Sequence, residues 1–184
     1  DGIDYAIENG ADIINMSLGG SNWQGTTMAN ALARAEEAGV VVLASAGNNG
    51  GRGSAWPAAY PTVVSVGAVE SDLSSSSYSN FSPIDVDVTA SGTQLTALAN
   101  GGNMFTGTSQ ASPSAAGVFA LVMDKFPELT PAEVRDRVFA FAQDSQQRVY
   151  FPDENKDVAI SKHGGVYAGT GLLDPSVPAP ALTP

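Results

Sequence analysis

The sequence predicts an α/β domain whose core is a doubly wound, mostly parallel β-sheet. Short apolar runs at residues 11–16, 40–44 and 62–68 indicate three buried strands. The last two runs are almost continuously apolar, which is typical of parallel strands covered on both faces. A helical segment separates the first two strands, and such a strand–helix–strand unit implies a right-handed crossover between parallel neighbours.

The first elements are two helices on either side of a strand. Asp1 can cap a short helix over residues 1–9, and the strand at 11–16 follows it. An alanine-rich segment at 28–38 predicts the second helix, which Gly39 ends.

The second half of the chain predicts shorter strands and two further helices. Residues 84–104 hold short β-like pieces with a Gly-Gly turn, and a helix is expected from Ser109 to about Lys125. The run Thr130-Pro131-Ala132-Glu133 combines a capping threonine, a proline at the first helical position and a glutamate at the third, so another helix begins there. Beyond Ala142 the periodic pattern weakens.

Composition and charge exclude several classes of protein. The chain has 184 residues, 43% of them hydrophobic and 15% charged, as in a packed globular domain. Its formal charge of −11 argues against binding to nucleic acid or to an anionic membrane. It contains no cysteine, which excludes disulfides and a cysteine nucleophile, and no apolar run long enough to span a bilayer.

The run from Gly107 to Pro113 places Ser109 at the start of a helix rich in small residues. Unpaired N–H groups of a first helical turn, together with the helix dipole, favour negative charge nearby. A serine before a helix is more commonly a helix cap. If Ser109 is instead a nucleophile, its attack on a carbonyl forms an oxyanion that these N–H groups can stabilise.

Three motifs in this order resemble the subtilisin-like serine proteases. Gly107-Thr108-Ser109-Gln110-Ala111-Ser112-Pro113 is similar to the family's nucleophile motif G-T-S-x-A-x-P. The other two are Ile14-Asn15-Met16-Ser17-Leu18-Gly19-Gly20, which resembles the substrate-binding strand, and Ala44-Ser45-Ala46-Gly47-Asn48-Asn49-Gly50, which resembles the oxyanion-hole segment. Weaker echoes at 56–61, 78–81 and 169–174 extend the resemblance over nearly the whole chain.

The resemblance implies that Ser109 is the nucleophile of an endopeptidase and that Asn48 donates to the oxyanion. Asn49 is the less favoured donor because the family's A-G-N pattern ends at Asn48. An asparagine here also argues against the sedolisins, which share the fold but carry an aspartate at this position. By itself, either asparagine could simply be a turn residue.

The family's catalytic aspartate and histidine precede the motifs seen here. We therefore expect a sheet that is incomplete at its N-terminal side, with both residues supplied by the N-terminal half of the same domain. We expect the isolated chain to be inactive, because no base would activate Ser109. His163, the only histidine, follows the serine in a Lys-His-Gly-Gly context and is not assigned as the base. The G-x-S-x-G elbow that accompanies a serine-then-histidine order elsewhere is absent.

The resemblance also implies a site for an extended polypeptide substrate. The expected substrate-binding residues form a strand edge, to which a peptide can add by main-chain pairing, and an uncharged pocket. They are Ser17, Leu18, Gly19, Ala44, Ser45, Ala46, Gly47 and Ala55.

No cofactor is required, but some relatives hold a weakly bound calcium or sodium ion. The matching positions are Ala58, Tyr60 and Val63, through their carbonyls, and Asp87. Hard oxygen donors suit such a cation. A bare polar loop explains the same residues equally well.

Residues 1–177 are interpreted as the C-terminal portion of a subtilisin-like peptidase domain, and residues 178–184 as a Pro/Ala-rich tail or linker. The resemblance implies a secreted or extracytoplasmic protein. The alternative is an inactive module with the same fold, which keeps the peptide-binding edge for a binding or structural role.

Overall fold

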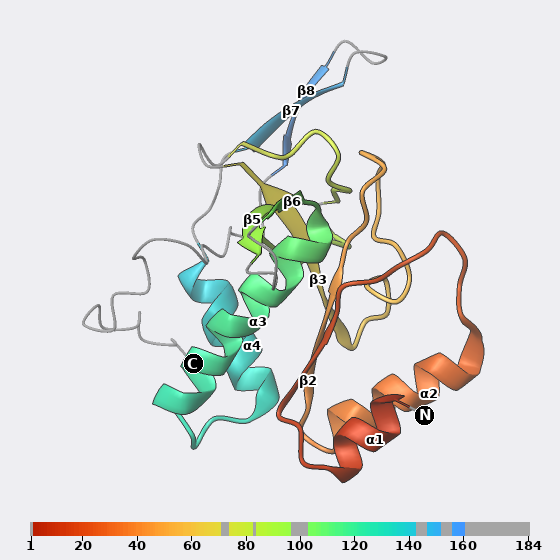
Figure 1. Cartoon of the computed structure of the whole chain (residues 1–184), viewed down its shortest axis with the longest axis vertical. Coiled ribbons are helices and arrows are strands. Elements are labelled where there is room, and N and C mark those ends of the chain that lie inside the picture. The colour runs from red at the N-terminus through yellow and green to blue at the C-terminus, as the bar shows by residue number, and fades with distance from the viewer. Residues whose placement is uncertain are drawn as a thin grey trace.

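Four parallel strands form the centre of the molecule (Figure 1). The computed structural model describes residues 2–70, 74–82, 84–96, 103–142, 147–151 and 156–160. The strands lie in the order β1-β2-β3-β4, and each pairs in parallel with the next. They are β1 (Ile13–Met16), β2 (Val41–Ser45), β3 (Val63–Val69) and β4 (Val88–Ser91).

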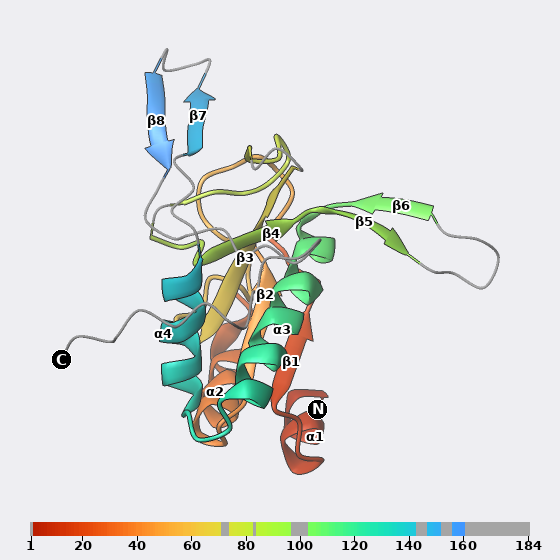
Figure 2. The ribbon, with the colours of Figure 1, turned by 90° about the vertical axis from the view of Figure 1, so that its left-hand side faces the viewer.

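Helices cover both faces of this sheet, as a doubly wound fold requires (Figure 2). Helices α1 (Gly2–Glu8) and α2 (Gly25–Glu37) pack with one apolar cluster. Helices α3 (Thr108–Lys125) and α4 (Pro131–Phe141) pack with the other. Strands β2 and β3 are buried along their whole length, which is why their sequences are apolar without alternation.

Helix α3 is the element that carries Ser109, and small side chains bring its first half close to the sheet. Ala111, Ser112 and Ala115 are completely buried there. Larger side chains such as Val118 and Phe119 fill the core further along the helix. The size gradient lets the amino end of α3 approach the carboxyl ends of the strands.

The sequence-based fold class is confirmed, and the boundaries differ by only a few residues. Helix α2 begins at Gly25, three residues before the alanine-rich pattern indicated. The expected start of α4 is also confirmed, because Thr130 and Glu133 form a complete capping box with a proline in the first turn. The peptide bond between Trp56 and Pro57 is cis.

Two antiparallel pairs lie outside the parallel sheet. Strands β5 (Thr93–Thr96) and β6 (Asn103–Thr106) extend away from the body of the molecule directly before α3 (Figure 2). Strands β7 (Gln147–Phe151) and β8 (Lys156–Ile160) form a hairpin in the stretch beyond Ala142, where the periodic pattern weakens. Cross-strand pairing, and not apolar periodicity, defines these strands.

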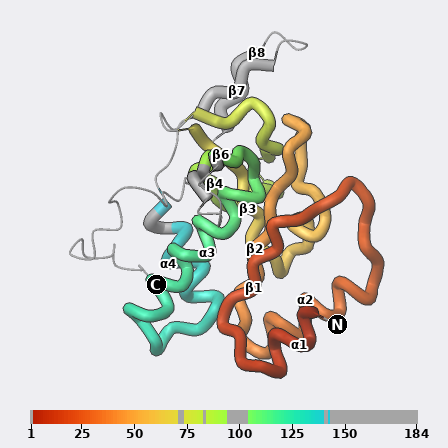
Figure 3. The backbone as a smooth tube through the Cα atoms, in the orientation of Figure 1, coloured from red at the N-terminus to blue at the C-terminus, as the bar shows by residue number. Residues whose placement is uncertain are grey.

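The connection from β1 to α2 is a long loop that swings away from the sheet before α2 returns along it (Figure 3). This loop begins with residues 17–20, so it carries the expected substrate-binding strand. The expected tail at 178–184 and His163 lie outside the described residues. Within the part of the chain that the structure describes, no helix is long and apolar enough to cross a membrane.

Candidate active site

Helix α3 begins directly at the expected nucleophile motif. Gly107 is the residue before the helix, Thr108 is the first helical residue and Ser109 the second. The Gly107 N–H donates to the carbonyl of Gly92 at the end of β4 (2.8 Å), and this bond closes the base of the β5–β6 hairpin. Ser109 is therefore placed at the positive end of an 18-residue helix.

The side chain of Asn48 is fixed by the first residue of α3. Its Oδ1 accepts hydrogen bonds from both the backbone N–H and the hydroxyl of Thr108, each 2.8 Å long. The Thr108 hydroxyl in turn accepts the N–H of Gly47 (3.2 Å). Because the carbonyl oxygen of the Asn48 amide is committed to Thr108, its Nδ2 is the end left to donate elsewhere.

A second donor lies in the same turn of α3. The first N–H groups of a helix have no partner within the helix. The N–H of Thr108 is used by Asn48, but among the described residues the N–H of Ser109 has no acceptor. The site therefore offers two unused donors, the Ser109 N–H and Asn48 Nδ2, from adjoining segments.

The carbonyl of Ser109 also lacks its usual helical partner, because the residue four positions later is Pro113, which has no N–H. The hydroxyl of Ser17 donates to this carbonyl instead (2.7 Å). Asn15 links the same two elements, since its Nδ2 donates to the Ser17 hydroxyl and its Oδ1 accepts from Ser112 on α3. These bonds hold the end of β1 against the first turn of α3.

The expected substrate-binding residues gather beside this turn. Gly20 and Trp56 exchange two backbone hydrogen bonds of 2.9 Å, which pair the strand at 17–20 with the segment around Ala55. At Gly19, a Cβ would lie only 3.2 Å from the Cβ of Ala55. The Leu18 side chain is 55% exposed.

The second expected wall of the pocket, residues 44–47, is mostly buried at the end of β2. Ala44 and Ala46 are completely buried and Ser45 is 3% exposed. The Ser45 hydroxyl donates to the carbonyl of Leu18 (3.3 Å), so this wall and the strand at 17–20 lie in contact.

The described residues place no proton acceptor on the Ser109 hydroxyl. No carboxylate, imidazole or amine among them is hydrogen-bonded to the Ser109 hydroxyl. The one pKa shift near the helix start is at Tyr78, whose hydroxyl touches Gly92, and burial raises the pKa of that hydroxyl. Tyr78 therefore stays neutral at ordinary pH and acts by packing.

The expected cation-binding residues lie at the start of β3 and β4. The Tyr60 carbonyl accepts the N–H of Val63 (3.0 Å), and Asp87 Oδ2 accepts the N–H of Ser65 (2.8 Å). Carbonyl and carboxylate oxygens are donors of the kind that hard cations prefer. Among the described residues, no group of three or more acidic or histidine side chains forms a metal cluster.

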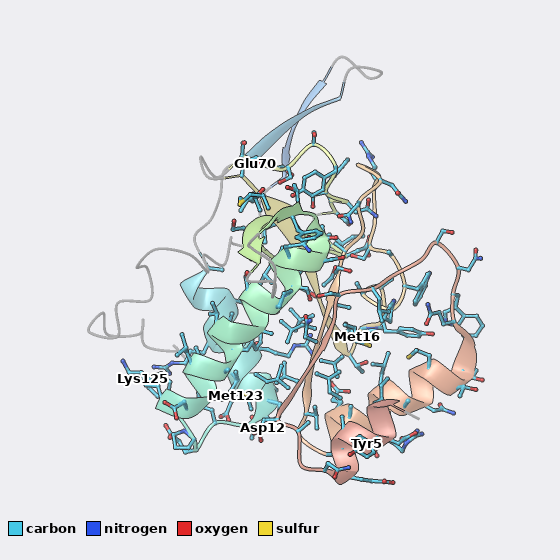
Figure 4. All side chains as sticks on the ribbon, viewed as in Figure 1. Tyr5, Asp12, Met16, Glu70, Met123 and Lys125 are labelled. Atoms are coloured by element: carbon cyan, nitrogen blue, oxygen red, sulfur yellow. The ribbon has the colours of Figure 1, made fainter. Side chains whose placement is uncertain are left out.

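A separate cavity of about 530 Å³ lies at the opposite end of β1 from Ser17. It is bordered by β1 and the C-terminal half of α3, and Figure 4 shows Asp12 and Met123 close together on its wall. Its other lining residues are Ile13, Ala120, Asp124, Phe126, Pro127 and Leu129. The cavity therefore takes no part in the site around Ser109.

Comparison with known proteins identifies the family. The model of the Subtilase family matches residues 1–166. The chain belongs to the subtilase family. The expectation drawn from the three motifs is thus confirmed.

Individual subtilases resemble the chain in sequence and in structure. It is 38% identical over 156 residues to subtilisin DY of Bacillus licheniformis, and 41% identical over 143 residues to subtilisin E of Bacillus subtilis (strain 168). These matches cover 82% and 74% of this chain. A cold-adapted subtilisin-like serine proteinase matches 92% of the chain with a TM-score of 0.75 and 30% identity. The prenylagaramide maturation protease PagA matches 88% with a TM-score of 0.74 and 28% identity.

The chain spans only part of these relatives. The matches cover 56% of subtilisin DY and 37% of subtilisin E. Of the two solved structures, the chain covers 60% and 62%.

Several contacts of the site were not foreseen from the sequence. The bonds from Thr108 to Asn48 and from Ser17 to the Ser109 carbonyl join residues far apart in the chain. Asn80, which belongs to a weak echo of the subtilase pattern, accepts bonds from the loop that carries Asn48. The one available signal was Pro113, because a proline four residues after Ser109 leaves a carbonyl that needs another donor.

We predict that Gly47→Ala destabilises the protein that contains this chain. Gly47 has φ of +113°, and a Cβ there would lie 2.5 Å from Asn80 Nδ2 and 3.2 Å from the Ala55 Cβ. The strain of a side chain at this φ should lower the free energy of unfolding by about 1–3 kcal/mol, measured by urea denaturation.

Gly51→Ala is the matched control, because nothing lies within 4 Å of a Cβ at Gly51 and its φ is not positive. Equal stabilities of the two variants would show that the backbone at Gly47 is not constrained as described.

Proposed function

We propose that the chain is the nucleophile-bearing part of a serine endopeptidase that cleaves peptide bonds through an acyl-enzyme on Ser109. The observation that carries this proposal is a pair of unused donors, the Ser109 N–H and the Nδ2 of Asn48, whose Oδ1 is bonded to the neighbouring Thr108. Its membership of the subtilase family supports the same chemistry.

In the first step the Ser109 hydroxyl attacks the carbonyl carbon of the scissile bond, and its proton passes to a base. The carbonyl oxygen becomes negatively charged, and the two donors and the positive end of α3 stabilise that charge. When the tetrahedral intermediate collapses, the amine leaves with the proton and the acyl group stays on Ser109. A water molecule then attacks the acyl-enzyme in the same way, and the carboxylic acid product leaves Ser109.

The base and its orienting carboxylate are proposed to be a histidine and an aspartate from a preceding segment of the whole protein. The described residues place neither beside Ser109, and the relatives that the chain matches are longer than the chain. We propose that this segment packs on the edge strand β1, which has β2 as its only strand partner among the described residues. The cavity beside β1 has apolar lining residues next to Asp12 and Asp124, and these apolar residues support this docking position.

The substrate is proposed to be an extended polypeptide that adds to the strand at residues 17–19. Gly20 already pairs with Trp56, so the strand is held rigid from one side. The neighbouring walls, from Ala55 and the buried end of β2, carry no charge. We therefore expect preference for an uncharged side chain next to the cleaved bond, which a series of peptide substrates would test. Preference for lysine or aspartate there would contradict the proposal.

Secretion is also proposed, because the named relatives include subtilisins of Bacillus species. Fractionation of the producing cells tests it, and retention of the protein in the cytoplasm would contradict it.

We predict that a fluorophosphonate labels the whole protein at Ser109. The label reacts only with an activated serine, so Ser109→Ala should abolish labelling, while Ser77→Ala, a change at an exposed serine, should leave it intact. Mass spectrometry of the labelled peptide gives the position. The 184-residue chain by itself should not react, because its described residues supply no base.

Two results would contradict this prediction. Labelling that survives Ser109→Ala would show that another residue is the nucleophile. A whole protein that binds extended peptides yet resists labelling would favour the inactive peptide-binding module.

We predict that Asn48→Leu lowers kcat by about 10²–10³ with little change in KM, because its donor acts mainly once the oxyanion forms. This magnitude is that of the corresponding donor in subtilisin itself. Asn49→Leu is the control: the Asn49 side chain is exposed, and only its backbone N–H makes a bond, to Asn80. Steady-state kinetics on a peptide substrate compares the two, and a larger loss for Asn49→Leu would contradict the assignment.

We propose in addition that calcium or sodium binds at the carbonyls of Ala58, Tyr60 and Val63 and the carboxylate of Asp87, as their oxygen chemistry allows. Calcium should then stabilise the protein by about 1–3 kcal/mol at concentrations well above its Kd, and EDTA should remove this gain. Asp87→Asn should abolish the calcium effect on Tm, whereas Asp136→Asn on the exposed side of α4 should preserve it. A Tm that is identical with calcium and with EDTA would contradict the site.

A further inference from the structure

Asn80 is a buried polar residue on the segment between β3 and β4, and its side chain reaches the loop that follows β2. Only 8% of its surface is exposed. Its Oδ1 accepts two backbone hydrogen bonds, from the N–H of Asn49 (3.0 Å) and from the N–H of Gly51 (3.3 Å). One carboxamide oxygen thus holds two backbone N–H groups of that loop.

Backbone bonds extend the same contact on both sides. The N–H of Asn80 donates to the carbonyl of Gly47 (2.9 Å), and the N–H of Gly50 donates to the carbonyl of Tyr78 (2.8 Å). The N–H of Phe81 donates to the carbonyl of Gly51 (3.0 Å). Residues 78–81, the clamp segment, therefore hold residues 47–51 along their length.

Asn48 lies within the clamped loop, and it is not part of the buried core. Its side chain is exposed, and both of its flanking residues, Gly47 and Asn49, bond to Asn80. Gly47 adds no side chain that could stiffen the backbone. The direction of Asn48 Nδ2 thus depends on two supports, Thr108 at its own amide oxygen and Asn80 at the adjoining backbone.

We propose that Asn80 is a positioning residue for the oxyanion donor Asn48, an inference that rests on the proposed function of Ser109 and Asn48. Asn80 does not touch the reacting atoms. It fixes the loop backbone so that Asn48 Nδ2 already points to the place where the oxyanion forms, and such preorganisation is what makes a donor effective.

The test is a double-mutant cycle in the whole protein, with Asn48→Ala, Asn80→Ala and both together. Asn80→Ala should lower kcat by about tenfold to a hundredfold with KM little changed, since a small misplacement of a catalytic group has effects of this size. In the Asn48→Ala background, Asn80→Ala should lower kcat by less than about twofold, because the group that Asn80 positions is gone. Asn49→Ala, which removes an exposed amide of the same loop, should change neither value.

Hydrogen exchange provides a readout that does not depend on activity. The N–H groups of Asn49 and Gly51 should exchange faster in Asn80→Ala and keep their protection in Asn80→Asp, which retains an acceptor oxygen. Should Asn80→Ala not fold, Asn80→Ser takes its place in both measurements, because its hydroxyl is too short to reach both N–H groups.

Three results overturn the inference: an unchanged kcat, an equal loss in both backgrounds, or unchanged exchange of the two loop amides. An equal loss would mean that Asn80 supports the fold and not Asn48. If the unmutated protein hydrolyses no peptide and takes no serine-directed label, the proposed function fails. The exchange measurement then still decides whether Asn80 clamps the loop.

Discussion

The structure around Ser109 depends on how the first turn of α3 satisfies its backbone groups. A helix start leaves N–H groups without intrahelical partners, and Pro113 adds a carbonyl, that of Ser109, without one. The Thr108 N–H goes to Asn48 and the Ser109 carbonyl to the hydroxyl of Ser17. Asn48 follows β2 and Ser17 follows β1. The two hydrogen bonds therefore hold the first turn of α3 against the ends of these neighbouring strands.

The parallel register of the sheet makes these bonds possible. Met16 pairs with Ala44, so the chain leaves β1 and β2 at the same level. The segments that follow them therefore meet at the carboxyl edge of the sheet, where ligands of open α/β folds bind. Small residues on α3 let the helix reach this edge, because Ala111 and Ala115 present little bulk to the strands. Close packing of α3 and the position of Ser109 at the sheet edge thus both require small residues in the first half of the helix.

Much of this arrangement could be predicted from the sequence. The continuous apolar runs indicated β2 and β3 because burial on both faces removes alternation, and the capping box indicated the start of α4. Ser109 and Asn48 were assigned from motifs, since each lies in a short run with a characteristic order of residues. The structure locates both residues, and their catalytic roles stay predictions.

The supports of the site could not be predicted in the same way. Ser17 and Ser109 are 92 residues apart, and Asn49 and Asn80 are 31 apart, so no local pattern connects them. The β7–β8 hairpin was missed for a related reason, because its pairing is between strands and leaves little trace in periodicity. Local sequence therefore located the candidate residues Ser109 and Asn48, but not the distant residues that bond to their segments.

The bond from the Gly107 N–H to the Gly92 carbonyl has a further consequence for the β5–β6 hairpin. It joins the residue where the chain leaves β4 to the residue that precedes α3, so the hairpin is a side branch closed at its root. Tyr78 and Ala68 pack against Gly92 and leave no room for a side chain there. This packing keeps the root of the hairpin in place. A change in the length of the connection from β5 to β6 should thus leave the start of α3 where it is. The surface beside Ser109 could then change while Ser109 itself keeps its position.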